Sequence, residues 1–272
     1  MSLFSRLKSE ASRRLEISRL KYHGKQYGSY GINEEVDLAI STIKSFSSTI
    51  NKKTIVLDIG ANKGEYAKAL LSKLGEDIEI HCFEPSADHC ETLNALQLDN
   101  PGKVFYHSTA ISSKNESRIL FKDQRGSGLA SLYERDLACH GLSLDLQEQV
   151  STSTIDDWMN VSHLHEISFA KIDVEGHELD IFKGAAQALS ESRILAVQFE
   201  FGGCNIDSRT FIKDFHSLLV RNYQYRLYRL APGKVLVDLN SYNEDFECFT
   251  WQNLLAFSNA RFIPPDYQLV FE

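Results

Sequence analysis

Apolar and polar residues follow two alternating spacings along most of the chain. Short runs of apolar and β-branched residues, typical of strands buried on both faces, give way to stretches in which apolar residues recur every three or four positions, as on one face of a helix. Strands that alternate with helices predict an α/β fold whose sheet is mainly parallel and carries helices on both faces. The runs that predict strands lie at 54–59, 78–85, 104–111, 167–173 and 194–200.

The pattern changes over the last third of the chain. An amphipathic helix is expected over 207–221, and two short apolar runs, 224–230 and 235–238, flank a Pro-Gly turn. A further run at 253–257 predicts a closing strand. Because a tight turn joins antiparallel neighbours, we expect the sheet to end in antiparallel strands.

The chemistry begins at the end of the first strand, in the stretch TIVLDIGANKGE at 54–65. Asp58 closes an apolar run, although a buried strand does not keep a carboxylate without a partner. Gly60, Asn62 and Gly64 then alternate through a turn in which small side chains let the backbone approach a ligand. A helical spacing follows, so this stretch predicts the strand, turn and helix that open a nucleotide-binding unit.

The second strand supplies the other half of that signal. Glu84 lies at its tip, 26 positions after Asp58, where a carboxylate accepts hydrogen bonds from both hydroxyls of a ribose. The glycines do not follow the dinucleotide pattern G-x-G-x-x-G, and no Walker lysine is present. A turn of the form Asp-x-Gly-x-Asn-x-Gly suits a ligand with an ammonium and a carboxylate, which points to S-adenosylmethionine as the cofactor.

A second group of polar residues follows the strand predicted at 167–173. Asp173, Glu175 and His177 crowd around a glycine, and Glu200 ends the next strand. Because the carboxyl ends of parallel strands meet at one edge, these side chains are expected beside the cofactor as the catalytic group. Four roles are open for these side chains: to take the proton of an acceptor hydroxyl, to orient that hydroxyl, to bind a divalent cation, or to cap the following helix. We favour the first two roles and assign no metal ligands.

Five stretches together resemble the FkbM family of class I methyltransferases. DIGANKG lies at 58–64, GSGLASL at 126–132, TSTIDDW at 152–158, KIDVEGHE at 171–178 and VQFEFG at 197–202. KIDVEGHE in combination with DIGANKG is the most specific of these signals. The resemblance runs from about residue 55 to residue 257 and leaves the first fifty residues uncovered.

The resemblance implies a Rossmann-like seven-stranded sheet of order 3-2-1-4-5-7-6 with its last strand antiparallel. It also implies O-methylation of a hydroxyl on a sugar, a glycan or a secondary metabolite. Three further cofactor contacts follow from it: Thr109 and Ala110 beside the adenine, and Ser127 in an irregular segment at 122–148. The alternatives are a non-catalytic module with the same fold and, less favoured, an NAD(P)-dependent oxidoreductase.

Composition and charge restrict the expected partners and location of the protein. With 43% hydrophobic residues, the 272 residues suffice for one large core. A net charge of −8 disfavours a nucleic-acid partner, so the expected partner is a small-molecule or glycan acceptor. Five scattered cysteines without a C-x-x-C pair, and the lack of an apolar run near the roughly 18 residues of a membrane span, predict a cytoplasmic protein.

The N-terminal segment departs from this acidity. Residues 1–25 carry seven basic and two acidic side chains, and apolar residues recur in them at every fourth position. This predicts a basic amphipathic helix that packs on the core or on another subunit, which leaves a homo-oligomer open. A membrane-surface anchor is an alternative that we do not favour. We therefore divide the chain into a helical extension, 1–50, and a methyltransferase domain, 51–272.

Overall fold

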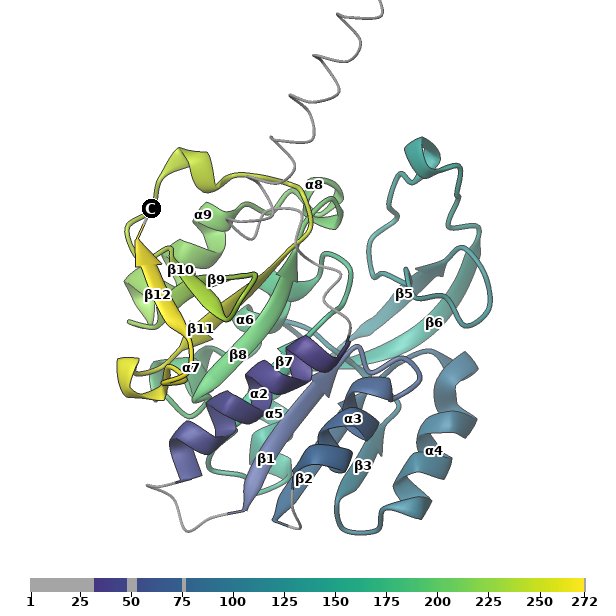
Figure 1. Cartoon of the computed structure of the whole chain (residues 1–272). Helices are drawn as coiled ribbons and strands as arrows, with labels where there is room; N and C mark the ends of the chain where they lie inside the picture. Colours follow the sequence, from purple (N-terminus) through teal and green to yellow (C-terminus); the bar gives the residue numbers. More distant parts are fainter. Residues whose placement is uncertain (1–31, 48–52, 75–76, 272) are drawn as a thin grey trace, which may run out of the picture.

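A nine-stranded sheet forms the centre of the molecule (Figure 1). The computed structural model describes residues 32–47, 53–74 and 77–271, so the basic helix predicted at 1–25 lies outside the described residues. The strands run in the order β12-β10-β9-β11-β8-β7-β1-β2-β3. Their bounds are Thr54–Ile59 (β1), Ile78–Phe83 (β2), Val104–His107 (β3), Phe169–Ile172 (β7), Ala196–Phe201 (β8), Arg226–Ala231 (β9), Val235–Asp238 (β10), Gln252–Phe257 (β11) and Gln268–Phe271 (β12).

The sheet is parallel from β3 to β8, as the alternation of strands and helices predicted. Beyond β8 it becomes antiparallel: β11 lies between β8 and β9 and runs opposite to both. β10 is antiparallel to β9, and β12 adds a further strand parallel to β10. The α/β class is therefore confirmed, while the expected count of seven strands is wrong, because β10 and β12 extend the edge.

A second, three-stranded sheet stands beside the carboxyl end of the main sheet (Figure 1). It consists of Ala110–Ile111 (β4), Ser117–Lys122 (β5) and Leu146–Ser153 (β6). The strand predicted over 104–111 is thus two strands: the backbone turns at Thr109, and Ser112 donates its N–H to Ser153 at 2.8 Å. This turn moves the chain off the main sheet and gives the molecule a lobe over the ends of the parallel strands.

Helices cover both faces of the main sheet. α2, α3 and α4 lie on one face, and α5, α6, α7, α9 and the following helical turns lie on the other. The bounds are Ile32–Ser47 (α2), Glu65–Lys73 (α3), Cys90–Asp99 (α4), Ile155–Val161 (α5), Glu178–Lys183 (α6), Ala186–Ser190 (α7), Cys204–Asp207 (α8) and Ile212–Phe215 (α9). Short 3-10 turns lie at Ala87–His89, Ala138–His140, Glu244–Phe246 and Ala260–Phe262.

The helix predicted over 207–221 begins later than expected. α8 ends at Asp207, and Arg209 takes a left-handed φ of 54° that no helix continues. The chain becomes helical again at Ile212, after the N–H of Phe211 has been capped by the Asp214 carboxylate at 2.9 Å. From His216 to Asn222 it is a π-helix.

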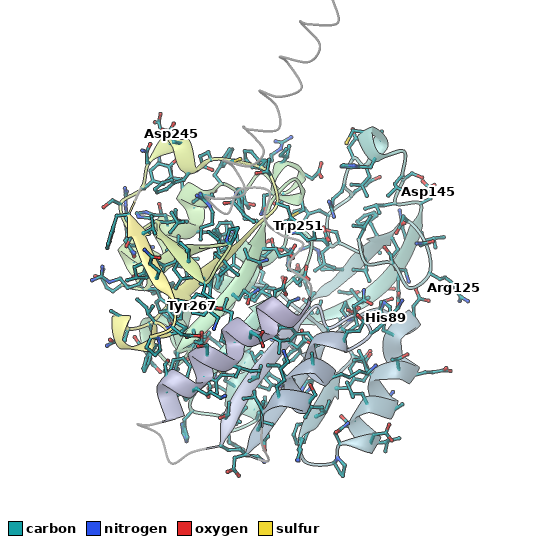
Figure 2. The ribbon with its side chains drawn as sticks, viewed as in Figure 1. His89, Arg125, Asp145, Asp245, Trp251 and Tyr267 are labelled. Atoms are coloured by element: carbon teal, nitrogen blue, oxygen red, sulfur yellow. The ribbon has the colours of Figure 1, made fainter. Side chains whose placement is uncertain are left out.

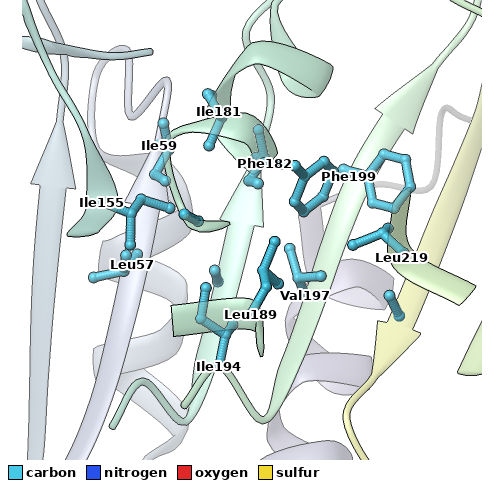
Figure 3. Close-up of a cluster of buried hydrophobic side chains, with 14 of the residues drawn as sticks. Leu57, Ile59, Ile155, Ile181, Phe182, Leu189, Ile194, Val197, Phe199 and Leu219 are labelled. Atoms are coloured by element: carbon cyan, nitrogen blue, oxygen red, sulfur yellow. The ribbon is translucent and has the colours of Figure 1, made fainter. Parts of the chain in front are cut away.

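Successive residues of each strand face opposite sides of the sheet, so the core has two layers. Ile55, Leu57 and Ile59 of β1 belong to the cluster under α5 to α7, in which Figure 3 labels Leu57 and Ile59. Val56 packs under α2 and α3 on the opposite face. Asp58 faces the same side as Val56, so its carboxylate is carried into the layer that α2 covers. α2 belongs to that core, although we had assigned its residues to the N-terminal extension. No helix in the described ranges has the length and apolar character that crossing a bilayer requires.

Candidate active site

The turn between β1 and α3 is held against the ends of two neighbouring strands. Gly60 and Ala61 donate their N–H groups to the carbonyl of Phe83 in β2, at 2.9 and 3.1 Å. Gly60 has a φ of 83°, and a Cβ added to it would lie 1.9 Å from the carbonyl oxygen of Asp173. Only glycine permits this left-handed backbone and this close approach together. The glycine-rich turn therefore touches both strands that flank β1.

Glu84 holds the same turn from the other side. One carboxylate oxygen accepts the N–H of Asn62 and the other accepts the N–H of Ser86, both at 2.9 Å. Burial raises the pKa of Glu84 to about 7, although the two backbone hydrogen bonds act in the opposite direction. Each oxygen keeps a lone pair beyond the one used, so Glu84 has capacity left for a ligand.

Many of the predicted site residues line one cleft between the main sheet and the lobe. It encloses about 660 Å³ of space, a figure that includes its open mouth. Its apolar walls come from β2, β4 and β5. The predicted residues that line it are Gly60, Asn62, Glu84, Ala110, Ser127, Asp173 and Glu175.

A second cavity adjoins the cleft and shares Gly60, Asn62 and Asp173 with it. Asp58 lines this cavity, and neither of its carboxylate oxygens accepts a hydrogen bond of normal geometry from the described residues. Burial raises the pKa of Asp58 to about 6, and the charge of Lys171 opposes that rise. The Ala67 backbone N–H also lowers this pKa, and the remaining lone pairs of the carboxylate suit a cationic ligand group.

Lys171, which the sequence does not predict as a site residue, interacts with several carboxylates of the site. Its ammonium lies 2.8 Å from the Asp173 carboxylate and 5.4 Å from the centroid of the Tyr66 ring. Burial lowers the pKa of Lys171, but Asp173 and three further carboxylates outweigh burial and raise it. The further carboxylates belong to Glu35, Asp58 and Glu200. Residues two positions apart face the same side of a strand, so the sequence spacing could have predicted that Lys171 lies beside Asp173.

Glu175 joins the site to the connecting segment 123–145 between β5 and β6. The Arg135 guanidinium forms an ion pair with the Glu175 carboxylate and lies 3.7 Å from Asp207. Ser131 donates its hydroxyl to the backbone carbonyl of Glu175 at 2.9 Å. Burial raises the pKa of Glu175 to about 7, opposed by the Arg135 charge. The predicted irregular segment therefore closes over the β7–α6 turn.

His177, predicted in the catalytic group, lies in the interior of the protein. It is buried, its Nε2 is 2.9 Å from the Ser112 hydroxyl, and it does not line the cleft. Burial lowers the pKa of His177 to about 4, so the ring is neutral at pH 7. The left-handed backbone at Glu175 and Gly176, with φ of 53° and 106°, turns the chain so that Glu175 faces the cleft and His177 the interior. Glu178 then accepts the Gly176 N–H at 3.1 Å.

Four further predicted site residues make contacts within the protein. The Thr109 hydroxyl donates to the Ser151 carbonyl at 3.1 Å and lies outside the cleft lining. Ser127 donates to Asp123 and offers its carbonyl to the Asn62 side chain at 3.2 Å. Gly64 has a φ of 72° and packs where a Cβ would meet Leu96 at 2.8 Å. Glu200 accepts a hydrogen bond from the indole of Trp251.

The site does not present an evident metal centre. Within the described residues, no three or more histidine, cysteine, aspartate or glutamate side chains are arranged to hold a metal ion. The carboxylates of the site face Lys171 and Arg135 instead, and these cations neutralise part of their charge.

The α/β fold is joined by a family match that defines the class of protein as a methyltransferase. Residues 58–227 match the model of the methyltransferase FkbM domain, and this chain belongs to that family. The match spans β1 to β9 and therefore includes both cavities.

Two curated relatives are similar at lower coverage. The 2-O-methyltransferase NoeI of Sinorhizobium fredii is 28% identical over 53% of this chain and 63% of its own length. The hexuronic acid methyltransferase AglP of Haloferax volcanii is 25% identical over 54% of this chain and 56% of its own length. The chain thus spans less than two thirds of the relatives that it matches.

Among solved structures, the methyltransferase FkbM of Methylobacillus flagellatus aligns with 80% of this chain and 47% of its own. Its TM-score is 0.47 and its identity is 18%.

Proposed function

We propose that this protein transfers a methyl group from S-adenosylmethionine to a hydroxyl of a sugar, a glycan or a secondary metabolite. The observation that carries the proposal is the meeting of two cavities at Gly60, Asn62 and Asp173. One cavity contains a carboxylate suited to a ribose, and the other contains a carboxylate suited to an ammonium. A single ligand with both groups would span the shared turn.

The residues of the two cavities fit the parts of this cofactor. Glu84, with lone pairs beyond its two backbone hydrogen bonds, would accept the ribose hydroxyls. Ala110 and the apolar residues around it would enclose the adenine, and Ser127, which lines the same cleft, would border the cofactor. Asp58 would face the ammonium of the methionine half.

The cofactor supplies an electrophilic methyl group on a positively charged sulfur. Asp173 lines both cavities and so stands where an acceptor hydroxyl would reach that methyl group. We assign Asp173 the role of orienting the hydroxyl and accepting its proton. The Lys171 ammonium, 2.8 Å away, holds the carboxylate in place. Glu175 borders the same space, paired with Arg135.

The acceptor class is supported by the relatives. NoeI is named for 2-O-methyl transfer and AglP for methylation of hexuronic acid. Both names describe oxygen-rich, sugar-like acceptors, and a carboxylate that accepts a hydroxyl proton suits such acceptors. We therefore propose a sugar hydroxyl as the favoured acceptor and a secondary metabolite as the alternative.

A ligand-binding experiment tests the cofactor. S-adenosylhomocysteine should raise the melting temperature, because a ligand that binds only the folded state stabilises it, whereas NAD and NADP should not. Glu84→Gln should weaken S-adenosylhomocysteine binding by roughly 1–3 kcal/mol. Glu191→Gln, on a half-exposed side chain away from the cleft, is the matched control. Stabilisation by NAD alone would refute the proposal.

The role of Asp173 is tested separately. Asp173→Asn keeps the shape of the side chain and should bind S-adenosylhomocysteine nearly as the wild type does. Its turnover should fall by roughly 10²–10⁴-fold, the usual range for acid–base groups. EDTA should leave wild-type turnover unchanged; activity that EDTA removes and Mg²⁺ restores would make Asp173 a metal ligand.

A further inference from the structure

Trp251 presents an aromatic face to solvent at the carboxyl edge of the sheet. Its side chain is 45% exposed, whereas the other tryptophan, Trp158, is 9% exposed and lies among packed aromatic rings. Figure 2 shows Trp251 beside the end of β8, on the side of the molecule that carries the β5–β6 lobe. A single exposed apolar side chain is common and indicates nothing by itself; what distinguishes Trp251 is the way its indole is held and its place beside the proposed reaction centre.

The indole is held by a hydrogen bond to a buried partner. Its Nε1–H donates to the carboxylate of Glu200, a residue that is only 8% exposed. Gly202 lies beside Trp251, and a Cβ added there would meet the Trp251 backbone at 3.3 Å and the indole Cδ1 at 3.6 Å, so a larger residue would crowd the indole. Glu200 and Gly202 both belong to the end of β8 and the residues directly after it. The aromatic face is thus preorganised, which reduces the entropy that a ligand must remove on binding.

Strand register places this face close to the proposed reaction centre. Ile172 of β7 pairs with Phe199 of β8, so the next residues along these parallel strands, Asp173 and Glu200, are neighbours. Gln252 at the start of β11 pairs with Phe201, which brings Trp251 to the same end of β8. Adjacent strands are about 4.8 Å apart, and the Glu200 carboxylate interacts with both residues: it accepts the indole N–H, and the charge of Asp173 adds to burial in raising the pKa of Glu200.

The geometry points to a sugar-binding subsite, and we propose that Trp251 stacks on the apolar face of the acceptor's pyranose ring. This inference rests on the proposed function, because it assigns a place to the acceptor of that reaction. One face of a pyranose consists of C–H groups, whose partly positive hydrogens suit the negative face of an indole. The hydroxyls around the ring suit carboxylates. A ring held on Trp251 would direct a hydroxyl toward Asp173.

The surrounding charge favours a sugar over a nucleic acid. Asp173 is paired with Lys171, burial raises the pKa of Glu200, and the whole chain has a net charge of −8, which disfavours a phosphate backbone. In this arrangement Glu200 does not contact the sugar. It is a positioning residue, because its carboxylate fixes the orientation of the indole. A hydroxyl-rich, uncharged or weakly charged ring is therefore the ligand that suits the Trp251 face and the Asp173 carboxylate.

The first test uses the fluorescence of Trp251. Since the chain has two tryptophans, Trp158→Phe leaves Trp251 as the remaining one. Methyl glucoside, methyl fucoside and methyl glucuronide are titrated into this variant with and without S-adenosylhomocysteine. We expect a saturable change of emission with at least one glycoside. Mannitol, which has hydroxyls but no ring face, should produce none. No response to any glycoside, or an equal response to mannitol, overturns the subsite.

The second test separates stacking from positioning by kinetics on the glycoside that is methylated. Trp251→Ala should raise KM roughly tenfold or more while kcat changes by less than about threefold, and Trp251→Phe should retain most of the affinity. Glu200→Leu should resemble Trp251→Ala, and Glu200→Gln, which still accepts the indole N–H, should restore KM. Phe271→Ala is the control, since Phe271 is 76% exposed on β12 at the far edge of the sheet.

The two proposals fail differently. If S-adenosylhomocysteine stabilises the protein and methyl transfer proceeds, but Trp251→Ala keeps the wild-type KM, the subsite is wrong and the methyltransferase function stands. If S-adenosylhomocysteine does not bind, the proposed function fails, and a glycoside response that requires Trp251 would still support a sugar site.

Discussion

The carbonyl oxygen of Asp173 occupies the space in which residue 60 would carry its Cβ. The separation of 1.9 Å is far shorter than any contact a real Cβ makes, so Gly60 is the side chain that this approach permits. The contact links the end of β1 to the end of β7, whose last residues, Ile59 and Ile172, are paired. The cofactor turn and the proposed reaction centre are therefore one packed unit.

Gly60→Ala should consequently damage both folding and binding. The new methyl group must displace the Asp173 carbonyl, and alanine is strained at a φ of 83°. We expect a loss of roughly 2–4 kcal/mol in the free energy of unfolding and no stabilisation by S-adenosylhomocysteine. Urea unfolding and thermal shift measure the two effects.

Gly203→Ala is the matched control for that change. Gly203 has a φ of −57°, and no atom lies within 4 Å of a Cβ built on it. This variant should keep wild-type stability and ligand response. A Gly60→Ala protein that still binds S-adenosylhomocysteine like the wild type would show that the Gly60–Asp173 contact does not shape the site.

Glu35 on α2 should make stability depend on pH. Burial raises its pKa from 4.5 to about 7, with Lys171 opposing the rise. Because the folded state holds this proton more tightly than the unfolded chain, Glu35 contributes stability below about pH 4.5 and loses it as pH rises through about 7. Glu35→Gln, which keeps the side-chain shape, should therefore gain stability relative to the wild type between pH 5 and pH 8.

Urea unfolding of both proteins at several pH values checks this expectation. The comparison matters because His81, His107 and His177 have pKa values lowered to about 4 by burial and act in the opposite direction. Their contribution is common to both proteins and cancels in the difference. A difference that stays flat from pH 5 to pH 8 would contradict an elevated pKa at Glu35.

His177→Gln should affect stability more than turnover. The ring is buried against Ser112 and lies outside the cleft, so its loss leaves a buried hydroxyl without its partner. We expect a cost of roughly 1–3 kcal/mol in unfolding free energy and a turnover within about threefold of the wild type. Single-turnover kinetics beside Asp173→Asn separates the roles; an equally large fall in turnover would return His177 to the catalytic group.

Arg135→Gln should loosen the segment 123–145 over the site. Its guanidinium pairs with Glu175 across a buried contact, and glutamine cannot replace that charge. Hydrogen exchange of the amides around 131–137 should become faster, and the pKa of Glu175 should rise further because Arg135 no longer lowers it. Arg125→Gln, on a 91% exposed side chain in the same segment, should change neither. Unchanged exchange in Arg135→Gln would mean that other contacts hold the segment.

The sequence by itself determined the class of the fold and the edge at which the chemistry lies. Asp58, Glu84 and Asp173 each follow a buried run, and parallel strands bring their carboxyl ends to one edge whatever the helices between them do. This local regularity was enough to predict that Glu84 and Gly60 share a cleft with Asp173. The identity of the cofactor rests on the same spacing and stays a proposal.

Only the tertiary structure decided how neighbouring residues divide between cleft and interior. Glu175 and His177 are two positions apart, yet the left-handed turn between them directs one to the cleft and the other to Ser112. The pairs Gly60–Asp173, Arg135–Glu175 and Glu200–Trp251 join segments that are far apart in the chain. Local patterns of polarity carry no information on such contacts, because they arise from the order of the strands and the path of the connections between them.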